Sequence, residues 1–105
     1  MRFIETPIFT QELKALLSDE EYRALQLALL FRPAQGPIIP SSGGLRKMRW
    51  RMAGKGKRGG VRLIYYWDKP GSTIYMLFIY PKNERDDLTA SQLRILSKLV
   101  REELG

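Results

Sequence analysis

The sequence predicts an α+β domain in which a mostly antiparallel, twisted sheet packs its apolar face on helices. Three observations support this class. Strand-like and helix-like segments follow one another in the order β-α-α-β-β-β-α. A short turn joins the two most apolar strand-like segments into a hairpin. The 105 residues, 44% of them hydrophobic, are enough for a single domain over 1–105 with one core.

The first third of the chain is predicted to form one strand and two helices. Arg2–Glu5 is the strand, and the apolar residues of 8–17 recur at spacings of three and four, which is typical of a helix. Ser18 and Glu21 have the spacing of a capping box, in which each side chain binds the backbone N–H of the other residue. They begin a second helix, which stops before Pro33 because proline cannot continue helical hydrogen bonding.

A loop and three strands are predicted next. Residues 33–44 form the loop, since they contain three prolines, three glycines and two serines. The strands are expected at Leu45–Met52, Val61–Asp68 and Thr73–Tyr80. The last two are rich in β-branched and aromatic residues, and the proline and glycine of residues 69–72 favour a turn between them.

A helix is predicted to close the domain. Thr89 and Gln92 have the spacing of a second capping box. Leu93, Leu96 and Val100 then recur at helical spacing and form an apolar stripe, which we expect to pack on the sheet.

The residue types that the chain lacks exclude several classes of function. There is no cysteine for a disulfide framework or a thiolate nucleophile, and no histidine for acid–base chemistry near neutral pH. The apolar run Tyr75–Tyr80 is too short to span a bilayer, and Met1–Pro7 has no apolar core typical of a signal peptide. We therefore expect a soluble, cytoplasmic protein that does not associate with membranes.

Positive charge is concentrated in one quarter of the chain. The formal net charge is +7, and residues 45–69 hold nine Lys and Arg against one acidic residue, Asp68. Cations this close repel one another unless an anion is bound, and the phosphate backbone of a nucleic acid supplies that anion. The segment therefore predicts a polyanionic partner. The alternative is a solvated basic loop that only keeps the protein soluble.

Strand alternation places several of these cations on one surface. Lys47, Arg49 and Arg51 share one face of the strand predicted at 45–52. Arg62 belongs to the neighbouring strand, so like charges would face one another across the sheet and destabilise it. A bound phosphate would relieve that repulsion, which favours nucleic-acid binding.

Residues 54–59 match the pattern G-x-G-x-x-G, but their context excludes a dinucleotide site. Such a site needs a strand before the glycines and a helix after them, whereas a strand is predicted to follow here. Gly60 also stands where a P-loop requires lysine. What remains is a glycine loop that carries Lys55, Lys57 and Arg58 between two strands.

The composition is compatible with RNA cleavage by the 2′-hydroxyl of the RNA itself. This reaction needs a base for the hydroxyl, cations for the charge on phosphorus, and an acid for the leaving 5′-oxygen. Without histidine the candidates are Lys and Tyr, and neighbouring cations lower the pKa of a lysine. Tyr80 and Lys82 share strand parity with each other and with Arg62, so pairing of the hairpin strands is expected to gather all three.

Three blocks of sequence together resemble the RelE/ParE toxin superfamily. They are G-G-L-R-K-M-R at 43–49, G-K-G-K-R-G-G-V-R-L-I-Y-Y at 54–66, and I-Y-P-K-N-E-R-D-D-L-T at 79–89. In this order and spacing they are most similar to HigB-type, ribosome-dependent mRNA interferases. The resemblance covers nearly the full chain and implies a compact RelE-like fold.

The resemblance also implies a function and partners. The expected activity is that of a toxin of a bacterial type II toxin–antitoxin system, an endoribonuclease that cleaves mRNA in the A site of the 30S ribosomal subunit and so inhibits translation. The expected partners are mRNA, ribosomal RNA and a cognate antitoxin, HigA-like with a helix-turn-helix. No cofactor and no metal are expected, because the chemistry of this family is metal-independent.

Residue roles follow from positions in the three blocks. Arg62 corresponds to the strand arginine that contacts the scissile phosphate, and Lys57 lies in the basic loop, which contributes phosphate binding and proton transfer. Lys82 stands where the family keeps a catalytic cation, and Tyr80 lies just before it. The expected catalytic residues are therefore Arg62, Lys82, Lys57 and Tyr80. The expected RNA- and ribosome-binding residues are Arg46, Lys47, Arg49, Arg51, Lys55 and Arg58.

The rest of the third block has supporting roles. Asn83 and Glu84 complete the block beside Lys82. Asp86 and Asp87 are interpreted as anions that suit the dipole of the last helix, and no metal is expected on Glu84, Asp86 or Asp87. Some relatives place a Tyr or His in that helix, but 89–105 contains neither, so the role would pass to Lys or Tyr80, or be absent.

Two other functions remain open at this point. One is a ParE-like toxin of the same fold that inhibits DNA gyrase and cuts nothing, although the dense cations at 55–62 argue against it. The other is a non-catalytic RNA- or ribosome-binding module, which needs the same positive surface but no proton donor or acceptor.

Overall fold

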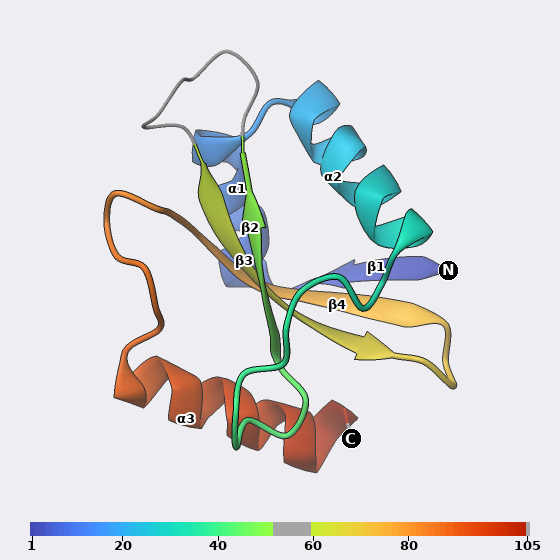
Figure 1. The fold of residues 1–105 in the computed structure, drawn as a ribbon, viewed down its shortest axis with the longest axis vertical. Helices are drawn as coiled ribbons and strands as arrows, with labels where there is room; N and C mark the ends of the chain where they lie inside the picture. The colour runs from blue at the N-terminus through green and yellow to red at the C-terminus, as the bar shows by residue number, and fades with distance from the viewer. Residues whose placement is uncertain (52–59, 105) are drawn as a thin grey trace.

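In the computed structural model, four strands form one sheet in the order β1-β4-β3-β2 (Figure 1). The structure describes residues 1–51 and 60–104. The strands are β1 Arg2–Glu5, β2 Arg46–Trp50, β3 Val61–Asp68 and β4 Thr73–Pro81. Neighbours among β2, β3 and β4 are antiparallel, and β1 pairs with β4 in parallel. The mostly antiparallel sheet predicted from the sequence is confirmed.

The helices begin and end close to the predicted positions. They are α1 Pro7–Leu16, α2 Asp19–Phe31 and α3 Ala90–Leu99, which continues as the π-helical turn η2 Val100–Leu104. Both predicted capping boxes form, with Ser18 at the start of α2 and Thr89 at the start of α3. None of the helices in the described part of the chain is long and apolar enough to cross a membrane.

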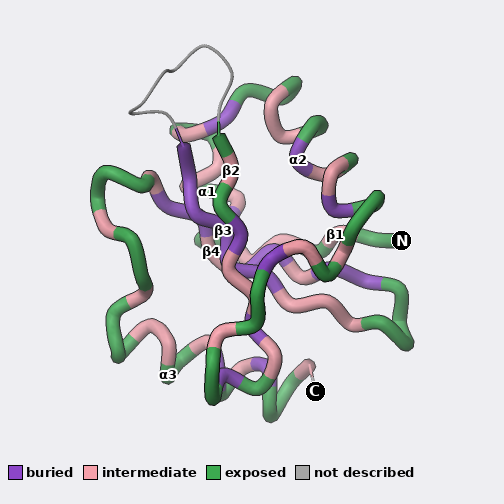
Figure 2. Tube along the Cα trace, viewed as in Figure 1, coloured by how far each residue is buried: buried purple, intermediate pink, exposed green. Residues whose placement is uncertain are grey.

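Helices cover both faces of the sheet, which corrects the prediction of one apolar face. On one face, α1 and α2 bury a cluster around Phe9, Leu25 and Leu63. On the other, α3 and η2 pack a second cluster around Ile64 and Val100. Figure 2 shows the buried residues concentrated on the central strands between these layers. The sheet is buried on both sides because β3 carries apolar residues at both parities.

A β-bulge in β4 explains how its apolar residues serve both faces. Ile64 is opposite Phe78 and Tyr65 is opposite Met76, so Leu77 is an extra residue in β4. The bulge reverses the alternation along β4. Met76 therefore packs on the α1–α2 side, whereas Leu77 and Phe78 both pack on the α3 side. Because both faces of β3 and β4 are apolar, sequence alternation does not reveal this irregularity.

Tyr65 fixes the loop at 33–44 to the sheet. Its buried hydroxyl accepts the Gly36 N–H at 3.0 Å and donates to the Pro33 carbonyl at 2.7 Å. A Cβ at Gly36 would lie 2.9 Å from the Tyr65 ring, so this close approach requires glycine. The loop in turn lies beside β2, because Lys47 donates its backbone N–H to Pro37 at 3.0 Å.

Candidate nucleic-acid interface

Arg62 is the central residue of the candidate site. It lies on β3, directly opposite Arg49 of β2 and Tyr80 of β4. The predicted approach of Arg62 and Tyr80 is thus confirmed. The side chain of Arg62 is only 7% exposed. A buried guanidinium opposite another arginine requires a counter-charge, because like charges across a sheet destabilise it.

Asp86 supplies this counter-charge. Arg62 donates through Nε and Nη2 to Asp86 Oδ1, at 3.0 and 2.9 Å. The hydrogen bond from Arg62 and the nearby charge of Lys47 hold the pKa of Asp86 below its usual range. The backbone carbonyl of Asp86 accepts the Tyr80 hydroxyl at 3.0 Å. Three hydrogen bonds therefore join Asp86 to the neighbouring strands, two to β3 and one to β4.

A second ion pair lies beside the first. Lys47 of β2 pairs through Nζ with Asp87 Oδ1 and donates to the Asp86 carbonyl at 3.3 Å. Both aspartates precede Thr89, the N-cap of α3, so they lie outside its first turn. Their interpretation as partners of the helix dipole is therefore corrected: they bind cations of β2 and β3 instead. No local pattern in the sequence indicates this pairing, since each partner is distant along the chain.

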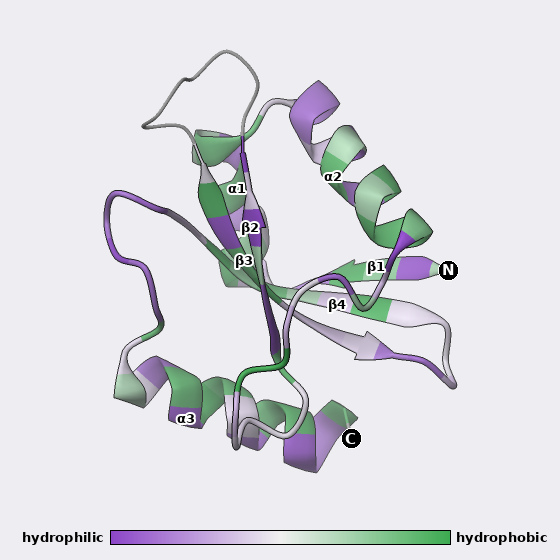
Figure 3. Ribbon diagram, in the orientation of Figure 1, coloured by the Kyte–Doolittle hydropathy of each residue, from purple (hydrophilic) through white to green (hydrophobic). Residues whose placement is uncertain are grey.

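The segment that carries these aspartates connects β4 to α3. It spans residues 82–89 and forms turns and bends without regular structure. It is the connection drawn mostly in the hydrophilic colour at the left of Figure 3. Leu88 is partly buried against the α3-side core and fixes the end of the segment. The polar stretch before Leu88 is mostly exposed, and Asp86 and Asp87 within it contact cations of β3 and β2.

Tyr80 is held as a neutral phenol. Its side chain is buried, and this burial, with the carboxylates of Asp87 and Asp86, raises its pKa to about 12. Arg62 and Arg85 oppose this increase only in part. At neutral pH Tyr80 is thus a proton or hydrogen-bond donor and not a base. Of the two roles expected for a tyrosine, base and acid, the raised pKa leaves Tyr80 only that of the acid or hydrogen-bond donor.

Lys82 and its neighbours occupy the turn after β4. Lys82, Asn83 and Glu84 are exposed, and the Lys82 backbone N–H binds the Gly60 carbonyl at 3.1 Å. Since β4 ends at Pro81, Lys82 lies just beyond the strand whose parity it was expected to share. The Glu84 carboxylate is 3.7 Å from Arg85. The turn therefore places an exposed lysine at the end of the strand that carries Tyr80.

The other predicted binding residues divide into three groups. Arg49 and Arg51 are exposed: Arg49 lies on β2 opposite Arg62, and Arg51 directly follows the strand. Arg46 instead donates to the carbonyls of Ala34 and Gly36, at 3.1 and 2.8 Å, and so stabilises the loop at 33–44. Lys55, Lys57 and Arg58 lie outside the described residues. Their proposed roles stay predictions.

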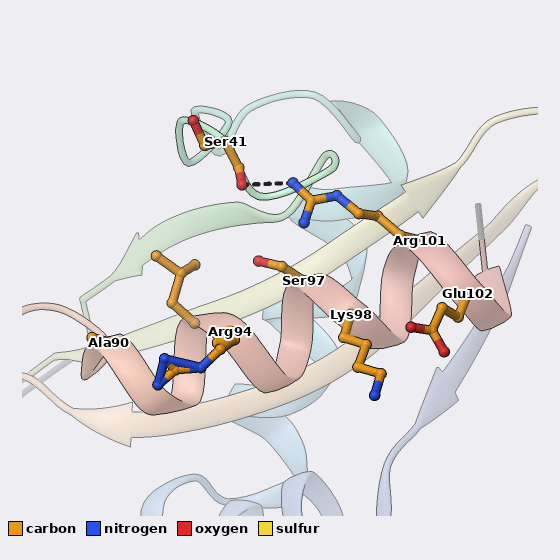
Figure 4. Close-up of a pocket in the computed structure, with 8 residues that line it drawn as sticks. Ser41, Ala90, Arg94, Ser97, Lys98, Arg101 and Glu102 are labelled. Carbon is orange, nitrogen blue, oxygen red and sulfur yellow. Dashed lines mark hydrogen bonds between the residues drawn. The ribbon is translucent and has the colours of Figure 1, made fainter.

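A cleft lined by three cations and by Glu102 lies between Ser41 and the helical segment formed by α3 and η2 (Figure 4), and no sequence motif indicates it. Its volume is about 460 Å³, and Arg94, Lys98 and Arg101 lie along it at helical spacing. Arg101 donates to the Ser41 carbonyl at 2.8 Å, which joins the cleft's two walls. Within the described ranges, Ser97 Oγ is the buried side-chain oxygen that lacks a hydrogen-bond partner. The cleft extends positive charge beyond residues 45–69.

The sheet order and the two helical layers define the class of the molecule as a RelE-like α+β fold. The solved structure of a free-state mutant of the toxin RelE from E. coli has the same fold, with a TM-score of 0.61. The match covers 91% of this chain and 92% of that one, at 14% sequence identity. No protein-family model matches the sequence.

Proposed function

We propose that the chain is the toxin of a bacterial type II toxin–antitoxin system, of HigB type, and that it cleaves mRNA in the A site of the 30S ribosomal subunit. The observation that carries this proposal is the cluster of Arg62, Tyr80, Lys47 and Arg49 on one face of a RelE-like sheet. The cluster combines phosphate-binding cations with a neutral phenol at the centre of the fold.

The proposed reaction transfers the phosphoryl group within the RNA. A base removes the proton of the 2′-hydroxyl, the 2′-oxygen forms a bond to phosphorus, and the bond to the 5′-oxygen breaks. The leaving 5′-oxygen takes up a proton, so the products are a 2′,3′-cyclic phosphate and a 5′-hydroxyl. No external reactant, metal or cofactor is needed.

Each residue has a role suited to its surroundings. Arg62 neutralises the negative charge that develops on the phosphate, because its guanidinium offers a fork of N–H donors. Lys82 and Lys57 carry out the two proton transfers. Tyr80, being neutral, donates a hydrogen bond or a proton to the reacting group. Asn83 and Glu84 support Lys82, and the remaining cations bind mRNA and ribosomal RNA.

The proposed partners follow from the same activity. The ribosome and its mRNA supply the polyanion that the +7 charge favours. A cognate antitoxin, HigA-like with a helix-turn-helix, would bind the toxin in the cytoplasm and prevent its entry into the A site.

The test is a purified translation reaction followed by primer extension on the mRNA. We expect cuts at defined codon positions with the wild-type protein and a loss of at least about 100-fold in rate for Arg62→Ala and Lys82→Ala. Arg23→Ala is the matched control, since it removes one exposed cation from α2 and should leave the cuts unchanged.

The outcomes separate the alternatives. Inhibited translation with uncut mRNA would exclude the nuclease and favour a ribosome-binding module. Inhibition of DNA gyrase in a supercoiling assay, with translation unaffected, would identify a ParE-like toxin instead. Equal loss of cutting in Arg23→Ala would show that total charge, and not the Arg62 cluster, determines the rate.

A further inference from the structure

The cation best placed to bind a phosphate is covered by a carboxylate of the same chain. The side chain of Arg62 is 7% exposed, whereas that of Asp86, which contacts its guanidinium, is 55% exposed. Two N–H groups of Arg62 point to one oxygen of Asp86. A phosphate oxygen that approached Arg62 from solvent would therefore find these two N–H groups already bound to Asp86.

The same segment covers a second cation. Asp87 pairs with Lys47, whose side chain is 20% exposed, while that of Asp87 is 75% exposed. Adjacent carboxylates of one connection thus neutralise cations of two neighbouring strands. Arg49 adds to the positive field around Asp86 without any hydrogen bond to it. The pattern is that of two anions lying on a cationic surface.

Carboxylates and phosphodiesters compete for such donors. Both present anionic oxygens that accept charge-assisted hydrogen bonds from a guanidinium fork. They cannot occupy the same N–H groups together, and two anions beside each other repel. We infer that Asp86 and Asp87 form an acidic gate, which a backbone phosphate of single-stranded RNA opens by displacing Asp86 from Arg62. The exchange of the Asp86 carboxylate for a phosphate takes place at the proposed RNA site, so the inference rests on the proposed function.

The attachments of the gate suit an exchange. Asp86 is held at its backbone by Tyr80 and Lys47 through single hydrogen bonds. The carboxylates of Asp86 and Asp87 are more than half exposed, so each returns to water when it is released from its cation. Arg62 keeps an anionic partner throughout, because the phosphate takes the position that the carboxylate leaves. A buried arginine is therefore never left unpaired.

The gate predicts that removing its charge strengthens RNA binding. The probe is a short fluorescent single-stranded RNA with 2′-O-methyl groups, which cannot be cleaved by 2′-hydroxyl attack, and the readout is fluorescence anisotropy with the full chain. Asp86→Asn should bind about tenfold more tightly than wild type, since the competing anion is gone while the side chain keeps its shape. Asp87→Asn should show a smaller increase.

Glu20→Gln is the control. It removes one negative charge from the exposed first turn of α2, the helix that packs on the face of the sheet opposite Arg62, and should change affinity less than twofold. Equal tightening in Glu20→Gln and Asp86→Asn would overturn the gate, because net charge alone would explain it. Unchanged or weaker binding in folded Asp86→Asn would also overturn it and make Asp86 a residue that positions Arg62.

Two further results keep the inference separate from the proposed function. If Asp86→Asn does not fold, as judged by circular dichroism, Asp87→Asn alone decides, with the same control. Tighter binding without mRNA cleavage by any variant would retain the gate and reject the nuclease. Codon-positioned cleavage by wild type without tighter binding in the Asn variants would retain the nuclease and reject the gate.

Discussion

At the scale of single residues, Tyr80 combines burial with two neighbouring carboxylates. Its hydroxyl binds the Asp86 carbonyl, and the nearby carboxylates of Asp87 and Asp86 disfavour the phenolate. Since an isolated tyrosine has a pKa of about 10, the folded chain keeps this proton at pH values where the unfolded chain loses it. The phenol thus links protonation to stability.

A pH-dependent stability follows for Tyr80. The raised folded pKa, about 12, means that the contribution of this residue is fully present below pH 10 and is lost as the pH rises toward 12. We expect the difference in free energy of unfolding between wild type and Tyr80→Phe to fall by about 1–2 kcal/mol over that range. Urea unfolding at a series of pH values measures it. A difference that stays constant from pH 9 to 12 would contradict the assignment.

The sequence predicts some of the residue contacts in the site and not others. Arg62 and Tyr80 were placed together correctly, because a hairpin with a short turn leaves few possible registers. The sequence position of Asp86 and Asp87 predicts an interaction with the dipole of α3, the nearest helix. Their actual partners lie 24 and 40 residues away, and no local pattern encodes such contacts.

At the scale of elements, local signals predicted the helix boundaries. The capping boxes of α2 and α3 each involve residues three apart, so the sequence contains the whole interaction. The bulge at Leu77 was missed because it arises from pairing between β3 and β4, and because both faces of these strands are apolar. With apolar residues on both sides, alternation no longer indicates the phase of a strand.

The capping box of α2 gives a prediction at this scale. Ser18→Ala removes the acceptor for the Glu21 N–H and should lower the free energy of unfolding by about 1 kcal/mol. Ser91→Ala is the control, since Ser91 is an exposed serine inside the first turn of α3 and should change stability by less than about 0.5 kcal/mol. Urea unfolding of the two variants measures the difference. Equal effects would show that the α2 cap contributes nothing specific.

At the scale of the whole molecule, charge is distributed unevenly over the fold. Lys47, Arg49 and Arg62 lie on one face of the sheet. Arg94, Lys98 and Arg101 add a second positive region along α3 and η2. Part of the first group is neutralised internally by Asp86 and Asp87. The effective charge presented to a polyanion therefore depends on these ion pairs as well as on the total of +7.

The charge distribution predicts the salt dependence of RNA binding. For about six single-strand phosphate contacts, the logarithm of the association constant should fall with the logarithm of salt concentration at a slope of roughly −4. Arg49→Gln should reduce the slope by roughly 0.7, since it removes one contact. Arg23→Gln should leave the slope unchanged. Anisotropy titrations at several salt concentrations measure all three, and equal slopes for the two variants would contradict the predicted surface.

The pairing of β1 with β4 has a consequence for biosynthesis. The ribosome makes β1 well before its partner, because β1 begins at Arg2 and pairs with β4, which begins at Thr73. The hairpin of β3 and β4, and the cation cluster that it gathers, also need this late segment. The sheet is therefore rich in contacts between distant parts of the chain, and such contacts form late. A nascent chain cannot assemble the cluster until β4 has been translated.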